Sequence, residues 1–532
     1  MDRPLEKLLF TVSLLTSGAF STSIAKTNDL AERPDIIYIL ADDLGYSDLG
    51  SYGSEIETPH LDRLASQGIR FSQFYNASKC EPSRASIMSG HYWPVTGLGV
   101  QRGATLGEVM RAAGYATFAL GKWHLNGSPI DRGFDRFFGH LSGASAFFPP
   151  IDRSFRLGKE PFTTQDPEFY VTDAITDYAI DFIKASKRAE PEKPYFMYLA
   201  YNAPHNPLQA PRQDIAKYRG KYLEGWEAIQ EKRYQQMQIL GMLSPETKIA
   251  PQPTNLPHWE TLSPAQKDLE DLRMATYAAM IDRMDQNIGR LFDSLESDGL
   301  TDNLLVIFMS DNGGSPYART DEIMLKQGKL PGDPGSNWEI GMGWAHVSNT
   351  PLRLYKRNQH EGGISTPFIV WWSGQIAEPS SITAQPAHII DLMPTFLELA
   401  GGTYAAAGKG KHLPPLPGKS LLPIFHGETR ESHDALYFQL FDHRAIRADD
   451  WKLTAVDDKD WELYNLADDR SETQDLSKSQ PERVEALATQ WEQWWLEAYG
   501  KPYAQFKNPT PPAHLRDDRS GGAHYVPTAM PE

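Results

Sequence analysis

Three short apolar segments, each followed at once by polar residues, constrain the fold of this chain more than any other feature. They cover residues 35–40, 195–200 and 304–309 and are rich in β-branched and aromatic side chains. Continuous apolar strands of this kind are typical of a parallel sheet that is buried on both faces. The polar clusters that follow them are Asp42-Asp43, Asn202 to His205 and Ser310 to Asn312.

Helical patterns lie between these strands and predict an α/β fold. The expected helices cover residues 59–67, 106–113, 173–187 and 271–297, and Thr58 is the expected cap of the first. The alternation predicts a large, mostly parallel sheet sandwiched by helices. Ligands bind beyond the carboxyl ends of the strands in such sheets, so the polar clusters mark the expected site.

A second, smaller region is expected after the Gly/Pro-rich stretch at 401–418. Short alternating apolar runs there precede a helical pattern with Trp491, Trp494 and Trp495 on one face. We expect a small antiparallel sheet with a packed C-terminal helix. The predicted organisation is a catalytic domain at 33–415, a C-terminal α+β subdomain at 416–502 and an irregular tail at 503–532.

The net charge restricts the possible binding partners, and the N-terminal sequence indicates the cellular location. The formal net charge is -17, from 52 Lys and Arg against 69 Asp and Glu, which argues against nucleic-acid binding. An apolar run from Leu8 to Phe20 and small residues up to Ala25 are typical of a signal peptide at 1–25. The rest of the sequence contains no segment long and apolar enough to span a membrane. We expect a periplasmic or secreted protein.

Cys80 is the one cysteine of the chain, and Pro82 and Arg84 follow it at fixed spacing. The ordinary interpretation of a lone cysteine is a buried free thiol. The spacing C-x-P-x-R, however, resembles the maturation signal of the type I sulfatases. In that family the cysteine is oxidised to formylglycine, whose hydrated aldehyde is the nucleophile. Glu81 departs from the small residue that is more usual after the cysteine.

Five further motifs occur in the order that this family has. The resemblance is to the sulfatase family of the alkaline-phosphatase-like superfamily, in its arylsulfatase-type branch, and it covers nearly the whole mature chain. It implies a sulfuric ester hydrolase with a large α/β domain and a smaller C-terminal sheet. The motifs are Ala41 to Tyr46, Gly121 to His124, Ala203 to His205, Ser310 to Gly314, and Lys356 with Glu361 to Gly363.

Asp42, Asp43, Asp311 and Asn312 offer oxygen ligands, which suits a hard cation. A helix cap or a solvated turn is the ordinary interpretation of any one of these aspartates. Together they resemble the single Ca²⁺ site of the family, which also includes the formylglycine made from Cys80. Asn312 stands where phosphatases often carry histidine, and this favours sulfate over phosphate chemistry.

The resemblance also implies catalytic roles for six residues. Cys80 supplies the nucleophile and should open a helix, whose N-terminus favours an anion. Arg84 holds the formylglycine diol. Lys122 binds sulfate and His124 helps to release it; both are expected in an extended segment with their side chains on one side. His205 and Lys356 contact the sulfate and protonate the leaving alcohol.

The substrate is a sulfated small molecule or a glycan, and the sequence leaves aryl and carbohydrate sulfates open. A formylglycine-generating or anaerobic sulfatase-maturating enzyme is the expected maturation partner. The alternatives are a phosphonate or phosphodiester hydrolase of the same superfamily, or an unconverted, non-catalytic sulfate-ester binder. The insert at 206–263 either shapes a substrate cleft or covers the sheet. Six further residues either form a rim that contacts the substrate or belong to the protein core: Trp93, Trp344, His346, Arg353, Arg357 and His360.

Overall fold

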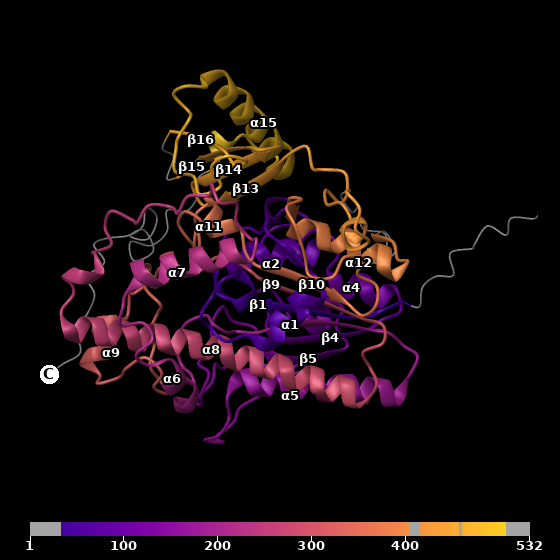
Figure 1. The fold of residues 1–532 in the computed structure, drawn as a ribbon. Helices are drawn as coiled ribbons and strands as arrows, with labels where there is room; N and C mark the ends of the chain where they lie inside the picture. Colours follow the sequence, from indigo (N-terminus) through magenta and orange to yellow (C-terminus); the bar gives the residue numbers. More distant parts are fainter. Residues whose placement is uncertain (1–32, 405–414, 457–459, 507–532) are drawn as a thin grey trace, which may run out of the picture. The chain divides into compact units, whose positions relative to one another are not determined.

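A ten-stranded mixed sheet forms the centre of the computed structural model (Figure 1). The structure describes residues 33–404, 415–456 and 460–506, so the expected signal peptide and most of the expected tail lie outside the described residues. The strand order is β11-β2-β10-β9-β1-β8-β4-β5-β6-β7. The strands are β1 (Asp35–Ala41), β2 (Ile69–Phe71), β4 (Ala116–Lys122), β5 (Arg136–His140), β6 (Phe155–Leu157), β7 (Glu160–Pro161), β8 (Tyr195–Ala200), β9 (Leu304–Ser310), β10 (Phe368–Trp372) and β11 (Ser381–Thr383).

The three apolar segments predicted from the sequence are the neighbouring strands β8, β1 and β9. Strand β1 pairs in parallel with both neighbours, and β4 pairs in parallel with β8 and β5. Leu40 lies opposite Ala200, and Ala41 lies opposite Ser310. The carboxyl ends of the strands therefore meet at one edge, and the polar residues that follow them come together. The prediction of a mostly parallel α/β sheet is confirmed.

Alternate residues of each central strand contact two separate cores, because successive side chains in a strand point to opposite faces. In β1, Ile37 and Ile39 join the core beneath α1, α5 and α8, whereas Ile36 and Tyr38 join the core beneath α2, α4 and α12 (Figure 1). Both faces are buried, which explains the continuous apolar strands. These helices are α1 (Pro59–Gln67), α2 (Cys80–Ser89), α4 (Leu106–Ala112), α5 (Val171–Ala189), α8 (Pro264–Ser297) and α12 (Leu392–Ala400).

Gly121 allows β4 to lie close to β8 at the end that carries the polar residues. It has a φ of +82°, and a Cβ built there would lie 1.9 Å from the carbonyl oxygen of Ala200. A side chain would therefore push the two strands apart. The next residue, Lys122, ends the strand. The glycine thus fixes the place from which this lysine reaches the site.

The C-terminal part forms a four-stranded antiparallel sheet covered by one long helix, as predicted. Trp491 and Trp495 of the helix are fully buried against Ile446, Leu453 and Leu463 of the sheet. The domain boundaries at 33–415 and 416–502 remain predictions. The elements are β13 (Leu436–Leu440), β14 (His443–Ala448), β15 (Trp451–Ala455), β16 (Glu462–Asn465) and α15 (Pro481–Tyr499).

One local prediction is confirmed in position but not in its contact, and another is wrong. Thr58 is the N-cap residue of α1, as predicted, but its side chain makes no cap hydrogen bond; the carboxylate of Asp285 accepts from the backbone N–H groups of His60 and Leu61 instead. His124 is not extended, because its φ is +52°. Among the described helices, even the longest lacks an apolar stretch that could cross a lipid bilayer.

Buried aromatic residues of the insert and most of the candidate rim residues belong to the protein interior. Trp226 opens α7 (Trp226–Ile239) and is buried against the ring of Trp344. His346 is also buried, beside Gln230. Arg353 contacts Glu462 of the C-terminal sheet. The remaining elements are η1 (Gly50–Tyr52), β3 (Phe74–Tyr75), α3 (Trp93–Thr96), η2 (Pro129–Arg132), α6 (Arg212–Tyr218), η3 (Trp259–Thr261), α9 (Asp321–Lys326), α10 (Met342–Ser348), α11 (Glu361–Ile364), β12 (Ala387–His388), η4 (Ile389–Asp391), α14 (Leu422–Phe425) and η5 (Tyr503–Gln505).

Candidate active site

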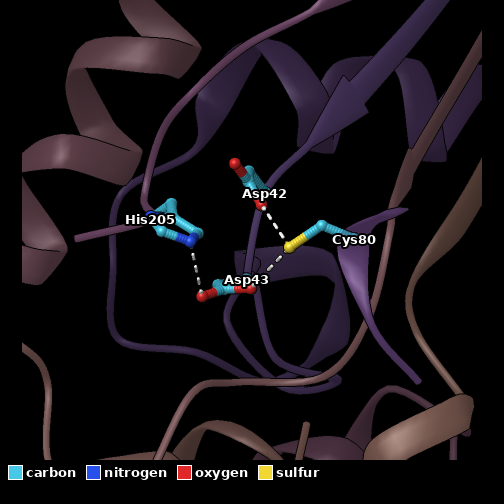
Figure 2. Close-up of side chains that lie close together, drawn as sticks. All are labelled: Asp42, Asp43, Cys80 and His205. Atoms are coloured by element: carbon cyan, nitrogen blue, oxygen red, sulfur yellow. Dashed lines mark hydrogen bonds and ion pairs between the residues drawn. The ribbon is translucent and has the colours of Figure 1, made fainter. Parts of the chain in front are cut away.

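Asp42, Asp43, Cys80 and His205 form a buried cluster at the carboxyl end of the sheet (Figure 2). One potential ligand atom from each lies within 4.8 Å of the others. The Cys80 thiol lies 3.4 Å from Asp42 Oδ1 and 3.8 Å from Asp43 Oδ1. Cys80 is the first residue of α2, as predicted, so its side chain lies at a helix N-terminus. The cluster could bind a metal ion.

Two buried lysines contact the carboxylates of the cluster. Lys122 Nζ lies 2.6 Å from Asp42 Oδ2. Lys356 Nζ lies 2.5 Å from Asp43 Oδ1 and 3.2 Å from the sulfur of Cys80. These two cations come from segments that are far apart in the sequence, and each is paired with a carboxylate of the cluster. The lysines therefore offset the negative charge of the aspartates, in a protein with a strongly negative net charge.

Arg84 and Asp311 form a second buried pair beside the cluster. Arg84 Nη2 and Nε lie 2.9 and 3.0 Å from Asp311 Oδ2, and Nη1 donates to the carbonyl oxygen of Lys122 at 2.7 Å. Neither side chain of the pair is exposed to solvent. Because Arg84 lies one helical turn after Cys80, this fork fixes the start of α2 relative to β4 and β9.

Asn312 and Asp43 carry buried oxygen atoms that lack a hydrogen bond from the described residues. Asn312 Nδ2 donates to Asp43 Oδ1 at 2.7 Å, whereas Asn312 Oδ1 and Asp43 Oδ2 accept none. A buried oxygen without a donor can be satisfied by a bound cation or a water molecule. The donor set of carboxylate and amide oxygens therefore fits a hard metal ion.

Burial and charge move the pKa values of the two aspartates in opposite directions. Burial raises the pKa of Asp42, and Lys122 offsets this only in part. Burial acts in the same direction on Asp43, but Lys356, His205 and Lys122 outweigh it and lower the pKa. The two pKa values shift in opposite directions because the cations near Asp43 outweigh its burial and those near Asp42 do not.

The two site histidines differ in their contacts. His205 Nδ1 donates to the carbonyl oxygen of Asn206 at 2.6 Å, and Nε2 lies 3.7 Å from Asp43 Oδ2. Burial lowers the pKa of His205, although Asp42 and Asp43 raise it. His124 lies near Lys122, and burial followed by the charge of Lys122 lowers its pKa. Burial therefore favours the neutral form of both imidazoles.

Several residues around the cluster have left-handed backbones, which side chains other than glycine rarely adopt. Asp43, Ser78, His124 and Arg357 have φ values of +65°, +57°, +52° and +74°. Strained backbones of this kind gather at functional sites, where the surrounding structure holds them. Here the strained residues lie in or next to the sequence motifs, and a left-handed backbone changes the direction of the side chain. The alternation of side chains along an extended strand does not predict these side-chain directions.

The sequence interpretation missed a buried ionic network that holds the segment after Lys356. Glu361 begins α11 and lies 2.9 Å from Lys452 Nζ of β15. The same ammonium group lies 2.8 Å from Glu472 Oε1, and Tyr75 donates to Glu361 at 2.8 Å. The sequence around Lys452 gives no signal for this contact, because its partners lie in other parts of the chain. The available sequence signal for this network was Lys452 itself, a charged residue within the apolar run of a predicted strand.

Lys79 also faces the site and was not singled out from the sequence. It directly precedes Cys80, and its ammonium group lies over the ring of Phe441, 5.5 Å from the centroid. Burial lowers the pKa of Lys79; Lys356 and Arg357 lower it further, while Cys80 raises it. The side chain is therefore part of the local charge pattern around residue 80.

Comparison with known proteins identifies the family. Residues 34–402 match the model of the sulfatase family, and residues 353–494 match that of the C-terminal part of N-sulphoglucosamine sulphohydrolase. The chain is 32% identical to an uncharacterized sulfatase of Schizosaccharomyces pombe over 525 residues, covering 87% of this chain and 93% of that protein. It is 33% identical to the arylsulfatase of Klebsiella aerogenes over 447 residues, covering 75% and 93%.

A solved structure shows the same fold. The crystal structure of Ps i-CgsB in complex with k-i-k-neocarrahexaose is 27% identical, with a TM-score of 0.63 and coverage of 88% of this chain and 93% of that chain. The sheet topology and the cluster around Cys80 are consistent with these matches, which cover most of the chain. The chain belongs to the sulfatase family, and it is an enzyme that hydrolyses sulfate esters.

Proposed function

We propose that this sulfatase hydrolyses a carbohydrate sulfate with a formylglycine made from Cys80 and one Ca²⁺ ion. The observation that carries the proposal is the position of Cys80, whose sulfur lies among two carboxylates and the Lys356 ammonium group. A structural thiol gains nothing from such surroundings. A residue that must become a nucleophile for an anionic ester needs both the cations and the metal ligands.

The group made at residue 80 would supply a nucleophilic hydroxyl, and a Ca²⁺ ion would polarise the sulfate oxygens and neutralise charge. Asp42, Asp43, Asp311 and Asn312 are the proposed ligands, together with residue 80. The unsatisfied oxygens of Asn312 and Asp43 support this choice, and the absence of sulfur or imidazole among the four favours Ca²⁺ over zinc. His205 also lies beside the carboxylates, but we assign its Nε2 to proton transfer with the substrate and not to the metal ion.

The side chains of the site divide the remaining work. Lys122 and Lys356 hold the oxygens of the sulfate group and stabilise its charge during transfer. Arg84 keeps the start of α2, and with it residue 80, at a fixed distance from Asp311. Negative charge on the bound ester would favour the protonated form of His205, which gives its Nε2 proton to the leaving alcohol while Nδ1 stays bound to the Asn206 carbonyl. His124 assists the release of sulfate.

The carbohydrate substrate is supported by the solved relative, whose crystal structure holds a carrageenan-type hexaose. An aryl sulfate remains a useful assay substrate, because the Klebsiella aerogenes relative is an arylsulfatase. We further propose a periplasmic or secreted location, supported by the signal-peptide pattern at 1–25. A formylglycine-generating or anaerobic sulfatase-maturating enzyme would then modify Cys80 before export or folding.

Graded conversion of Cys80 tests the proposal. Preparations are made with different amounts of co-expressed formylglycine-generating enzyme, and peptide mass spectrometry measures the aldehyde fraction at residue 80. Sulfate release from sulfated oligosaccharides and from an aryl sulfate should rise in proportion to that fraction. Metal analysis should find about one Ca²⁺ per chain. Activity that is independent of the aldehyde fraction would refute the formylglycine proposal.

A further inference from the structure

The backbone of Asp43, one of the proposed metal ligands, is strained. Its φ is +65°, in the left-handed region, and only 2% of the residue is exposed. Its carboxylate faces Cys80 and His205 (Figure 2). A strained residue keeps its conformation only where its surroundings hold it. The contacts of the Asp43 backbone therefore decide where this carboxylate lies.

Tyr277 of α8 contacts that backbone directly. Its hydroxyl lies 3.1 Å from the carbonyl oxygen of Asp43 and 2.7 Å from Asp48 Oδ2. The one proton of the hydroxyl is shared between these two acceptors. Among the described residues, Tyr277 is the hydrogen-bond donor to the Asp43 carbonyl. Both Tyr277 and Asp48 are buried, so the contact is made away from bulk solvent.

Two other donors hold Asp48 in place. Its carboxylate accepts from the backbone N–H of Gly45 at 2.8 Å and from Arg233 Nη1 at 2.7 Å. Together with Tyr277, these donors occupy both carboxylate oxygens. Charge-assisted hydrogen bonds of this kind fix a buried carboxylate in one orientation. The Tyr277 hydroxyl therefore has a fixed second partner besides the Asp43 carbonyl.

Arg233 connects this group to the insert at 206–263. It lies in α7 and is 1% exposed, and its Nε and Nη2 lie 2.8 and 2.9 Å from the carboxylate oxygens of Glu55. The guanidinium thus joins Asp48 to Glu55 through three hydrogen bonds. The sequence left open whether the insert shapes a substrate cleft or covers the sheet. Through Arg233, the insert also supports the loop that carries Asp43.

We propose that Tyr277, with Asp48 and Arg233 behind it, positions Asp43 for the metal ion and so sets the affinity of the site for Ca²⁺. This rests on the proposed function and deepens it. The three are positioning residues, because they act through Asp43. Without the phenol hydroxyl, the Asp43 carbonyl loses its described donor, and the strained backbone can relax and shift the carboxylate. Loss of such an outer partner costs roughly 10- to 100-fold in metal affinity.

The test measures Ca²⁺ binding by isothermal titration of the metal-free protein, at a matched aldehyde fraction at residue 80. Tyr277→Phe keeps the ring and removes only the hydroxyl, so it should raise the Kd for Ca²⁺ by about 10-fold or more. The Ca²⁺ concentration that gives half-maximal sulfate release should rise by the same factor, and saturating Ca²⁺ should restore most of the rate. Arg233→Lys cannot contact Asp48 and Glu55 together and should raise the Kd by a smaller factor.

Tyr170→Phe is the matched control, because the hydroxyl of this buried tyrosine also donates to a backbone carbonyl, that of Gln209, at 2.9 Å. It should leave the Kd for Ca²⁺ unchanged. A Kd for Tyr277→Phe equal to the wild-type value would overturn the inference, as would an equal rise in Tyr170→Phe, which would indicate a general loss of stability. Wild-type protein that binds no Ca²⁺ would refute the proposed metal site and this inference with it.

Discussion

Lys452→Met should destabilise the protein by breaking the buried network that holds the segment after Lys356. The Lys452 ammonium group lies 2.9 Å from Glu361 and 2.8 Å from Glu472, and all three side chains are fully buried. Removing the cation leaves two buried carboxylates without their shared partner. Breaking a buried ion pair in this way costs about 3–5 kcal/mol.

This cost converts to a small but measurable change in Tm. An unfolding entropy of about 2.1 cal/mol/K per residue gives about 1.1 kcal/mol/K for a chain of 532 residues that unfolds cooperatively. The expected decrease in Tm is therefore about 3–5 °C by scanning calorimetry. The exposed Lys478→Met is the matched control and should change Tm by less than about 1 °C.

The effect should depend on pH with a defined sign. Burial raises the pKa of Glu361, but Lys452, Arg470 and Arg447 outweigh it and hold the pKa below its ordinary value of 4.5. A carboxylate with a depressed folded-state pKa contributes stability above its unfolded pKa and loses that contribution as the pH falls through the folded value. The difference in Tm should be complete at pH 7 and should shrink below pH 4.5.

A double variant separates lost charge pairing from lost packing. Adding Glu472→Gln to Lys452→Met removes one of the stranded carboxylates and should recover at least part of the lost Tm. A Tm within 1 °C of wild type for Lys452→Met, at about pH 7, would refute the reasoning. So would an unchanged difference at pH 4, because protonated carboxylates do not need the lysine.

Further expectations concern the site and its support. Arg84→Lys should lower kcat/KM by about 100-fold or more in steady-state assays, because lysine cannot reproduce the fork on Asp311; an effect below about threefold would contradict this. Asp285→Ala should cost about 1–3 kcal/mol in urea unfolding, since the N–H groups of His60 and Leu61 lose their acceptor; an unchanged midpoint would contradict that assignment. Removal of metal with a chelator should abolish sulfate release and lower Tm, and Ca²⁺ at about 100 times its Kd should restore about 2.7 kcal/mol of stability; full activity after verified metal removal would exclude the metal site.

The sheet and the meeting of its polar ends could be predicted because they depend on local pattern. The apolar runs at 35–40, 195–200 and 304–309 specify buried strands, and parallel strands necessarily place their following residues at one edge. That geometry brings Asp43 close to His205 and Asn312. The helix that begins at Cys80 followed from the same local reasoning.

Contacts across the chain and strained backbones could not be predicted from pattern. The pairing of Lys452 with Glu361 depends on how the C-terminal sheet packs, and nothing near either residue specifies it. The left-handed backbone of His124 overrides the alternation expected of a strand. Thr58 is the N-cap residue of α1, but Asp285, distant in sequence, accepts the hydrogen bonds that the Thr58 side chain does not. In each case, tertiary contacts outweighed a local preference.

The most direct test of the central account compares converted wild-type protein with Cys80→Ala. Initial rates of sulfate release are measured by ion chromatography on an aryl sulfate and on sulfated oligosaccharides, beside phosphate release from the matched phosphate ester. The account predicts that Cys80→Ala loses about 10³-fold or more of the sulfate-releasing rate while keeping the wild-type Tm within a few degrees. Sulfate release within about tenfold of wild type by the folded variant, or faster release of phosphate than of sulfate by the converted enzyme, would contradict it.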